Sequence, residues 1–222
     1  MQSRSFDEMK PDLISMGLAY YGEPSKIAPD TEKVIIEVVN LFSEDQKLYR
    51  MLLAWMDRFG DLIHVERLAS FIDSLSDKDK LILGVTALKR VNSGDIRFKA
   101  MYEKIKKQKI RQNFNMSGQD NYLLEKLGVD PEFKIFGITT SKILPSEDKK
   151  LMDRKWVLKS NLWLRLRALL GSNFRADMTF VKLNHLAINP YAAMKVLRCS
   201  KETSYRIWGS LEEAGLESLI QI

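Results

Sequence analysis

The chain has 222 residues, of which 45% are hydrophobic and 29% are charged, and its formal net charge is +6. This composition is ordinary for a folded chain with one large or two modest domains, and it argues against global disorder. The single cysteine, Cys199, excludes an internal disulfide. The longest apolar patches, such as MLLAWM at 51–56, are too short to cross a bilayer, and the first residues do not resemble a signal peptide. We therefore expect a cytoplasmic protein that does not enter a membrane.

Residues 1–112 are predicted to form an α-helical domain that mediates oligomerisation or binds a signal or a protein partner. Asp30 or Thr31, Ser43 and Ser76 precede apolar segments as N-caps, and Gly60 is expected to end a helix. The apolar faces of VIIEVVNLF and YRMLLAWM are possible contact surfaces for a second copy. Helical spacing of apolar residues predicts helices at 6–22, 29–42, 43–60, 64–75, 76–91 and 95–112.

Residues 113–150 are rich in turn-forming Asn, Gly, Asp, Pro and Ser, which predicts a linker with short elements. Within it, YLLEKLG favours a short helix and FKIFGITT a short strand. Residues 151–222 return to a helical pattern, beginning with one helix over 149–171 and a second segment over 174–189. Their expected buried residues are Leu151, Leu158, Leu162, Leu166 and Leu169 in the first, and Met178, Val181, Leu183 and Leu186 in the second. The fold class expected for the whole chain is mainly α.

Positive charge is concentrated in two parts of the chain. Residues 154–206 contain eleven basic and two acidic residues, a net of +9, and residues 88–111 contain nine and two, a net of +7. The rest of the chain therefore carries 6 − 9 − 7 = −10. Such asymmetry favours an anionic partner, most commonly nucleic acid, although lysines that only solvate helix faces would explain the second cluster as well.

The segment YAAMKVLRCSKETSYRIWGSLEEAGL, residues 191–216, is predicted to form a helix pair. Pro190 suits a first helical turn, Ser200 suits the N-cap of the second helix, and Gly215 suits a left-handed C-cap. Ser204, Ile207, Trp208 and Leu211 share one face and are expected to point inward. The opposite face carries groups that contact phosphates and base edges in a major groove. The candidate DNA-binding residues are Lys201, Glu202, Thr203, Tyr205 and Arg206, together with Arg198, Lys195 and Arg175.

This helix pair resembles the winged helix-turn-helix of bacterial transcription regulators. The resemblance rests on YAAMKVL, the turn at Ser200, KETSYRIWGSLEEAG and the preceding RLRALLGSNFRADMTFVKL, and it covers roughly residues 156–222. It implies a DNA-binding regulator that reads the major groove of double-stranded DNA. Two residues depart from the pattern, because Arg198 stands where such turns commonly have Gly and Ser204 where a β-branched apolar residue is usual.

The ending ESLIQI is expected to open a wing as a strand, yet no return strand follows it. An unpaired strand edge invites pairing with another chain, and two helix-turn-helix units can occupy neighbouring half-sites on DNA. We therefore expect a homodimer. The alternative is that the strand packs within its own domain and the protein is a monomer.

Catalytic signals are weak, so the chain is expected not to be an enzyme. It has two histidines, and His64 is interpreted as a helix-start or interface residue. One cysteine provides no cluster with zinc-ligand spacing, so we expect neither a metal nor a cofactor. Cys199 lies beside Arg198 and Lys201, which can lower a thiol pKa and support redox sensing, although a structural role in the turn is favoured.

Two function classes stay open at this point. The favoured one is a DNA-binding transcription regulator. The alternative is a non-enzymatic adaptor, or an antitoxin-like protein, that uses a winged-helix fold for packing, and such folds also bind RNA. The sequence does not specify an operator, a signal or the sign of regulation.

Overall fold

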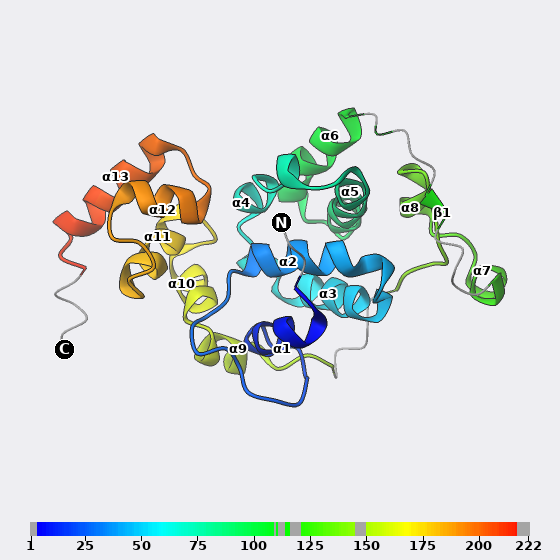
Figure 1. Cartoon of the computed structure of the whole chain (residues 1–222), viewed down its shortest axis with the longest axis horizontal. Helices are drawn as coiled ribbons and strands as arrows, with labels where there is room; N and C mark the ends of the chain where they lie inside the picture. The colour runs from blue at the N-terminus through cyan, green and yellow to red at the C-terminus, as the bar shows by residue number, and fades with distance from the viewer. Residues whose placement is uncertain (1–3, 109, 111–113, 116–120, 145–149, 217–222) are drawn as a thin grey trace.

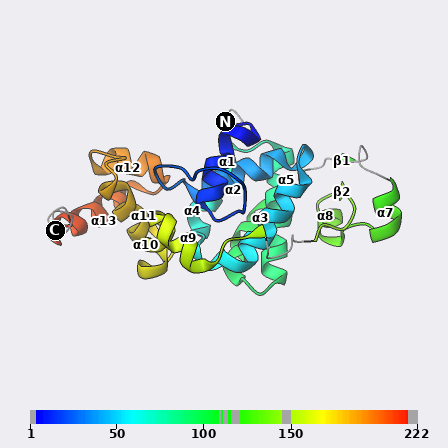
Figure 2. The same ribbon diagram turned by 90° about the horizontal axis from the view of Figure 1, so that it is seen from below.

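The computed structural model describes residues 4–108, 110, 114–115, 121–144 and 150–216, and this part of the chain is mainly helical. The molecule is elongated (Figure 1 and Figure 2). Helices from the first half of the chain form its middle, α7 and α8 lie at one end, and the last helices lie at the other. The expectation of a mainly α fold is confirmed for the described residues.

The middle of the molecule is built from six α-helices joined partly by short 3-10 turns. Asp30 caps one helix by accepting from the Lys33 amide, and Ser76 caps another by accepting from the Asp79 amide, as predicted. The prediction for Ser43 is wrong, because Ser43 lies in a 3-10 turn and Asp45 provides the cap instead. The elements are α1 (Phe6–Ser15), α2 (Thr31–Asn40), η1 (Leu41–Ser43), α3 (Gln46–Phe59), η2 (Gly60–Leu62), α4 (Val65–Ala69), η3 (Ile72–Ser74), α5 (Asp77–Asn92), η4 (Ile96–Phe98) and α6 (Lys99–Lys107).

These elements enclose the first hydrophobic core. Trp55 and Phe59 of α3 are completely buried in it, and the Trp55 indole donates to the carbonyl of Met16 across 2.6 Å. The apolar residues of α2 and α3 that the sequence offered as a contact surface for a second copy are also buried here. Both helices therefore use these faces within the chain, and that suggestion for the dimer contact is wrong.

Part of the segment predicted as a linker packs against the first core. Phe133, Phe136 and Ile138 are buried in it, and the Phe133 ring stacks on Phe42. The strand expected over FKIFGITT is only partly present, because Asp130 caps a short helix that begins at Pro131. The elements here are β1 (Phe114–Asn115), α7 (Asn121–Leu127), α8 (Pro131–Ile135) and β2 (Ile138–Thr139), and β1 pairs with β2 in parallel.

The single helix expected over 149–171 is in fact two helices, α9 (Arg154–Ser160) and α10 (Leu162–Leu170). Asn161 interrupts the helix with extended backbone, and its side chain accepts from the Leu164 amide and donates to the Ser15 carbonyl. The interruption changes which residues face inward. Leu169, which was expected to be buried, is exposed, whereas Arg167 of the same helix is buried.

A second hydrophobic core lies under α11 (Phe174–Leu183), α12 (Pro190–Leu197) and α13 (Lys201–Glu213). Its centre is Trp163 of α10, whose ring stacks on Phe180 with 4.3 Å between centroids. Met178 and Val181 are buried as predicted, but Leu186 is 37% exposed in the loop that follows α11. Among the described residues, no helix is long and apolar enough to cross a membrane.

Candidate nucleic-acid interface

The helix pair α12–α13 begins and ends where the sequence predicted. Asn189 caps α12 by accepting from the Ala192 amide, and Pro190 occupies the first turn. Arg198 ends α12 with a left-handed backbone, φ +55°, which a turn of this kind needs and which most often falls to glycine. Ser200 caps α13 by accepting from the Thr203 amide at 3.1 Å. The break between the helices is thus three residues long and fixed at both sides.

Ser204 brings the two helices close together. Its side chain is completely buried, and its hydroxyl donates to the Pro190 carbonyl across 2.6 Å. A small side chain at this crossing lets the helices approach, and the hydrogen bond satisfies a hydroxyl that would otherwise be buried without a partner. This contact gives a physical reason for serine at a position where a β-branched apolar residue is usual. Ile207, Trp208 and Leu211 continue the same buried face.

The opposite face of α13 is polar and open to solvent. Lys201, Glu202, Tyr205 and Arg206 are exposed, and Thr203 is half-buried. The Lys201 ammonium lies 5.6 Å from the centroid of the Tyr205 ring. The structure therefore brings the five candidate residues of α13 to the N-terminal half of one helix.

The three remaining candidate residues lie in different surroundings. Arg175, at the start of α11, donates to the Ser210 hydroxyl at 3.3 Å and lines a polar hollow of about 320 Å³ with Arg206 and Thr203. Lys195 is exposed on α12, with its ammonium 4.4 Å from the centroid of the Tyr191 ring. Arg175 thus lies beside the polar face of α13, and Lys195 lies on the other helix of the pair.

Arg198 points back toward the N-terminal helices. Its guanidinium donates to the Ser70 carbonyl at 3.0 Å and lies over the Phe71 ring, 4.5 Å from the centroid. Both partners belong to the segment directly after α4. In this arrangement Arg198 joins the helix pair α12–α13 to the N-terminal helices and is engaged before any ligand arrives.

The positive charge of residues 154–206 is less available than the sequence count suggests. Arg167 is buried, Lys182 is buried and pairs with Glu212 at 3.1 Å, and Arg154 pairs with Asp61 at 2.6 Å. These three residues are committed to contacts within the chain. The exposed basic residues that remain are spread over several helices, with Lys155 and Lys159 on α9, Arg165 on α10, Arg175 on α11, Lys195 on α12, and Lys201 and Arg206 on α13.

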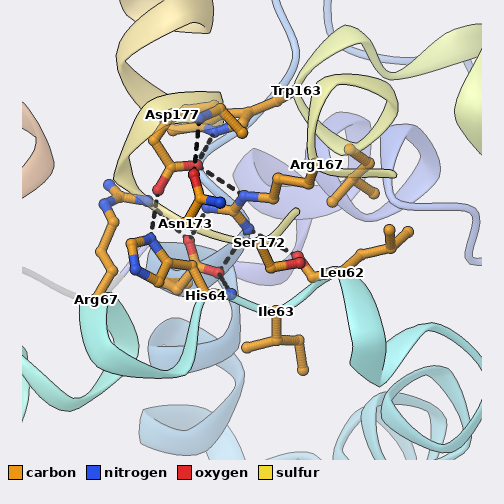
Figure 3. A network of polar contacts seen from close by, with 12 residues as sticks. Leu62, Ile63, His64, Arg67, Trp163, Arg167, Ser172, Asn173 and Asp177 are labelled. Atoms are coloured by element: carbon orange, nitrogen blue, oxygen red, sulfur yellow. Dashed lines mark hydrogen bonds and ion pairs between the residues drawn. The ribbon is translucent and has the colours of Figure 1, made fainter. Parts of the chain in front are cut away.

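Sequence reasoning missed a buried network of charges between the two cores (Figure 3). Arg167 is its centre, with its Nε donating to Asp177 and its two terminal nitrogens donating to Glu32, each at 2.7 Å. It also donates to the Leu62 carbonyl, and the Trp163 indole donates to Asp177 at 2.6 Å. The network therefore joins α2 and η2 from the first part of the chain to α10 and α11 from the last.

Arg67 of α4 extends this network to the helix pair α12–α13. Its guanidinium pairs with Glu32 at 2.7 Å and with Asp30, which caps α2. It also donates to the carbonyls of Val196 and Leu197, at 3.5 Å and 3.2 Å. These carbonyls belong to the last turn of α12, where a cation satisfies groups that have no partner inside the helix. Arg67 and Arg198 together hold the turn between α12 and α13 against α4.

His64 lies at the start of α4 and at the boundary of the two cores, in agreement with its interpretation as a helix-start or interface residue. Its Nδ1 lies 2.6 Å from the Asp177 carboxylate, and its backbone amide donates to Glu32. Burial alone would raise the pKa of Asp177, but Arg167 and the hydrogen bond from His64 hold this pKa well below its ordinary range. Burial would lower the pKa of Arg167, yet Glu32 and Asp177 raise it. The network is thus charged and fully paired, which suits a structural role.

Cys199 lies in the turn and is half-buried. Its thiol pKa is raised, mainly by burial. The lowered pKa on which redox sensing depended is therefore absent, and the structural interpretation of Cys199 is the better one. Among the described residues, no group of three or more His, Cys, Asp or Glu side chains is placed to hold a metal ion.

Comparison of the chain with models of protein families, with curated proteins and with solved structures found no match. The expected strand at ESLIQI falls on residues 217–222, outside the described residues. The resemblance to a winged helix-turn-helix and the expectation of a homodimer therefore stay predictions.

Proposed function

We propose that the protein is a non-enzymatic, DNA-binding transcription regulator that reads the major groove with α13. The observation that carries the proposal is the division of α13 into two faces. Ile207, Trp208 and Leu211 are buried, whereas Lys201 and Arg206 face solvent in the first half of the helix. Reading the major groove requires a helix with one face packed against its own domain and a polar face that is free to enter the groove.

The dimensions and the chemistry of α13 are consistent with this use. Its 13 residues extend about 20 Å, and the major groove, about 12 Å wide, admits one α-helix. Arg206 is suited to a guanine edge, while Lys201 and Thr203 near the helix start are suited to phosphates. Arg175, in the adjoining polar hollow, adds a cation beside the same helix.

A binding assay with matched variants tests the proposal. Duplex fragments from the source genome would be titrated with the parent protein, Arg206→Ala and Lys201→Ala, and with Arg165→Ala as the control. Arg165 is an exposed arginine of α10, outside the helix pair. Each lost base contact is expected to weaken specific binding by about 1–3 kcal/mol. Each lost phosphate contact is expected to reduce the slope of the logarithm of the binding constant against the logarithm of the salt concentration by about 0.9. Equal affinity of the parent and both α13 variants would show that this helix does not enter the groove.

A protein-binding adaptor is the second candidate, and one observation favours it. The loop between α11 and α12 exposes apolar side chains, with Ile188 88% exposed and Tyr191, at the start of α12, 49% exposed. Exposed apolar side chains that lie together can mark protein contacts. If Arg206→Ala leaves nucleic-acid binding unchanged and Ile188→Ser abolishes capture of a defined partner, the adaptor is the better assignment.

A further inference from the structure

A hollow of about 480 Å³ lies between α4, α6 and the start of α11, and we refer to it as the α4–α6 hollow. Its wall is largely apolar, with Ile63 and Val65 on one side and Met101 on the other. Ala69 and Ala100 also line it, and their short side chains leave the space open. Small-molecule sites have volumes of about 300–1,000 Å³ and mostly apolar walls with few polar groups, so this hollow has the size and lining of a ligand site.

The cation available to a ligand in the hollow is Lys104. The other lining cation, Arg97, has its Nε and Nη2 bound to Asp95 and also donates to the Gly60 carbonyl, so it is already committed. Lys104 pairs with Asp73 at 3.1 Å, but the Asp73 side chain is 73% exposed. An exposed pair of this kind is weak, so the Lys104 ammonium can exchange Asp73 for the carboxylate of a ligand at little cost.

The position of Glu66 limits the ligand to one negative group. Glu66 and Asn173 line the α4–α6 hollow and also the polar hollow beside α13, so they mark the end that is nearer α13. Lys104 comes from α6, which contributes nothing to the second hollow. A ligand with its anion at Lys104 extends its body over Ala69 and Ala100 toward Glu66, where a second anion would be repelled.

We propose that the α4–α6 hollow binds a small monocarboxylate with an apolar body. Lys104 holds the carboxylate, and the apolar wall between α4 and α6 holds the chain or ring. Such a ligand contacts α4, whose Arg67 holds the last carbonyls of α12, and it lies next to the polar hollow lined by Arg206. Its influence on DNA binding rests on the proposed function, whereas its binding to the hollow does not.

Isothermal titration of the full chain with octanoate, octan-1-ol and octylammonium tests the site. We expect octanoate to bind at one site per chain and more tightly than the other two probes, because only octanoate pairs with Lys104. Ala100→Trp places a large ring in the hollow from an exposed position of α6 and is expected to abolish binding. Lys104→Gln is expected to weaken it about two- to fivefold. Lys107→Gln, a lysine of the same helix that does not line the hollow, is the matched control and is expected to leave binding unchanged.

Three results would overturn the proposal: no binding of octanoate, undiminished binding to folded Ala100→Trp, or equal loss in Lys104→Gln and Lys107→Gln. If Ala100→Trp does not fold, the two lysine variants decide the matter alone. The DNA assay repeated with octanoate separates the two proposals. If the protein binds octanoate but not DNA, the ligand site is supported and the proposed DNA-binding function is contradicted. If it binds DNA but not octanoate, the DNA-binding function is supported and the ligand site is contradicted.

Discussion

Replacing Asp177 by alanine tests whether the buried network joins the two halves of the molecule. Asp177 accepts from the Trp163 indole at 2.6 Å and from Arg167 at 2.7 Å, and it lies 2.6 Å from His64 Nδ1. Alanine would leave all three partners without this acceptor in a site that water does not reach. It would also remove one of the two fully buried carboxylates that balance Arg67 and Arg167.

The size of the effect follows from these contacts. Removing one partner of a buried ion pair destabilises a protein by about 3–5 kcal/mol, because the remaining charge is left uncompensated. Asp177→Asn also removes the charge, but it keeps one oxygen that can accept from Trp163 and Arg167, so we expect a loss near the lower end of that range, about 3 kcal/mol. Asp73→Ala removes an acid that, in the part of the chain that the structure describes, forms an exposed ion pair with Lys104, and we expect a loss of less than about 1 kcal/mol.

Urea unfolding at pH 7, followed by circular dichroism and tryptophan fluorescence, measures these differences. Trp163 and Trp208 report on the second core and Trp55 on the first. In Asp177→Ala we expect the second core to unfold at a lower urea concentration than the first. The unfolding curves followed by circular dichroism and by tryptophan fluorescence would then no longer coincide. A loss below about 1 kcal/mol, equal to that of Asp73→Ala, would refute the argument that this network holds the cores together.

The network also predicts how stability depends on pH. Because the folded-state pKa of Asp177 lies below its ordinary value of 3.8, the stability it supplies is fully present above that pH and is lost as the pH falls through the folded-state value. Acid unfolding of the parent should therefore be steeper below pH 3.8 than that of Asp177→Asn, and equal slopes would contradict the pairing. In the helix pair, Ser200→Ala removes the cap of α13 and should lower the free energy of unfolding by about 1 kcal/mol in the same urea assay, whereas an unchanged value would show that the cap contributes nothing.

The parts of the fold that could be predicted are those whose signals lie within a few residues. Ser200 and Thr203 are three positions apart, and Pro190 directly follows its capping residue, so the sequence alone defined the limits of α12 and α13. The break at Asn161 was missed because its second partner is the carbonyl of Ser15, 146 residues away. Without that contact, the apolar pattern on both sides is compatible with one continuous helix.

The same reasoning explains what could be foreseen of the candidate site. Lys201 and Arg206 both lie outside the stripe that Ser204, Ile207, Trp208 and Leu211 form, and helical spacing is enough to predict that they are exposed when this stripe is buried. The surroundings of Arg198 and Arg167 depend on distant partners, Phe71 and Glu32, which no local pattern indicates. A basic residue read from sequence alone is assigned to the surface, and that assumption fails where a carboxylate from another helix neutralises it.

The pairing of Glu32 with Arg167 has a consequence for the order in which the chain folds during synthesis. The two residues are separated by 135 positions, and Glu32 lies on α2, which is synthesised well before α10. Until α10 has been made, this carboxylate has Arg67 and the His64 amide as partners but lacks Arg167. The first core therefore reaches its final form only after α10 has been made, because Leu164 of α10 also packs in it.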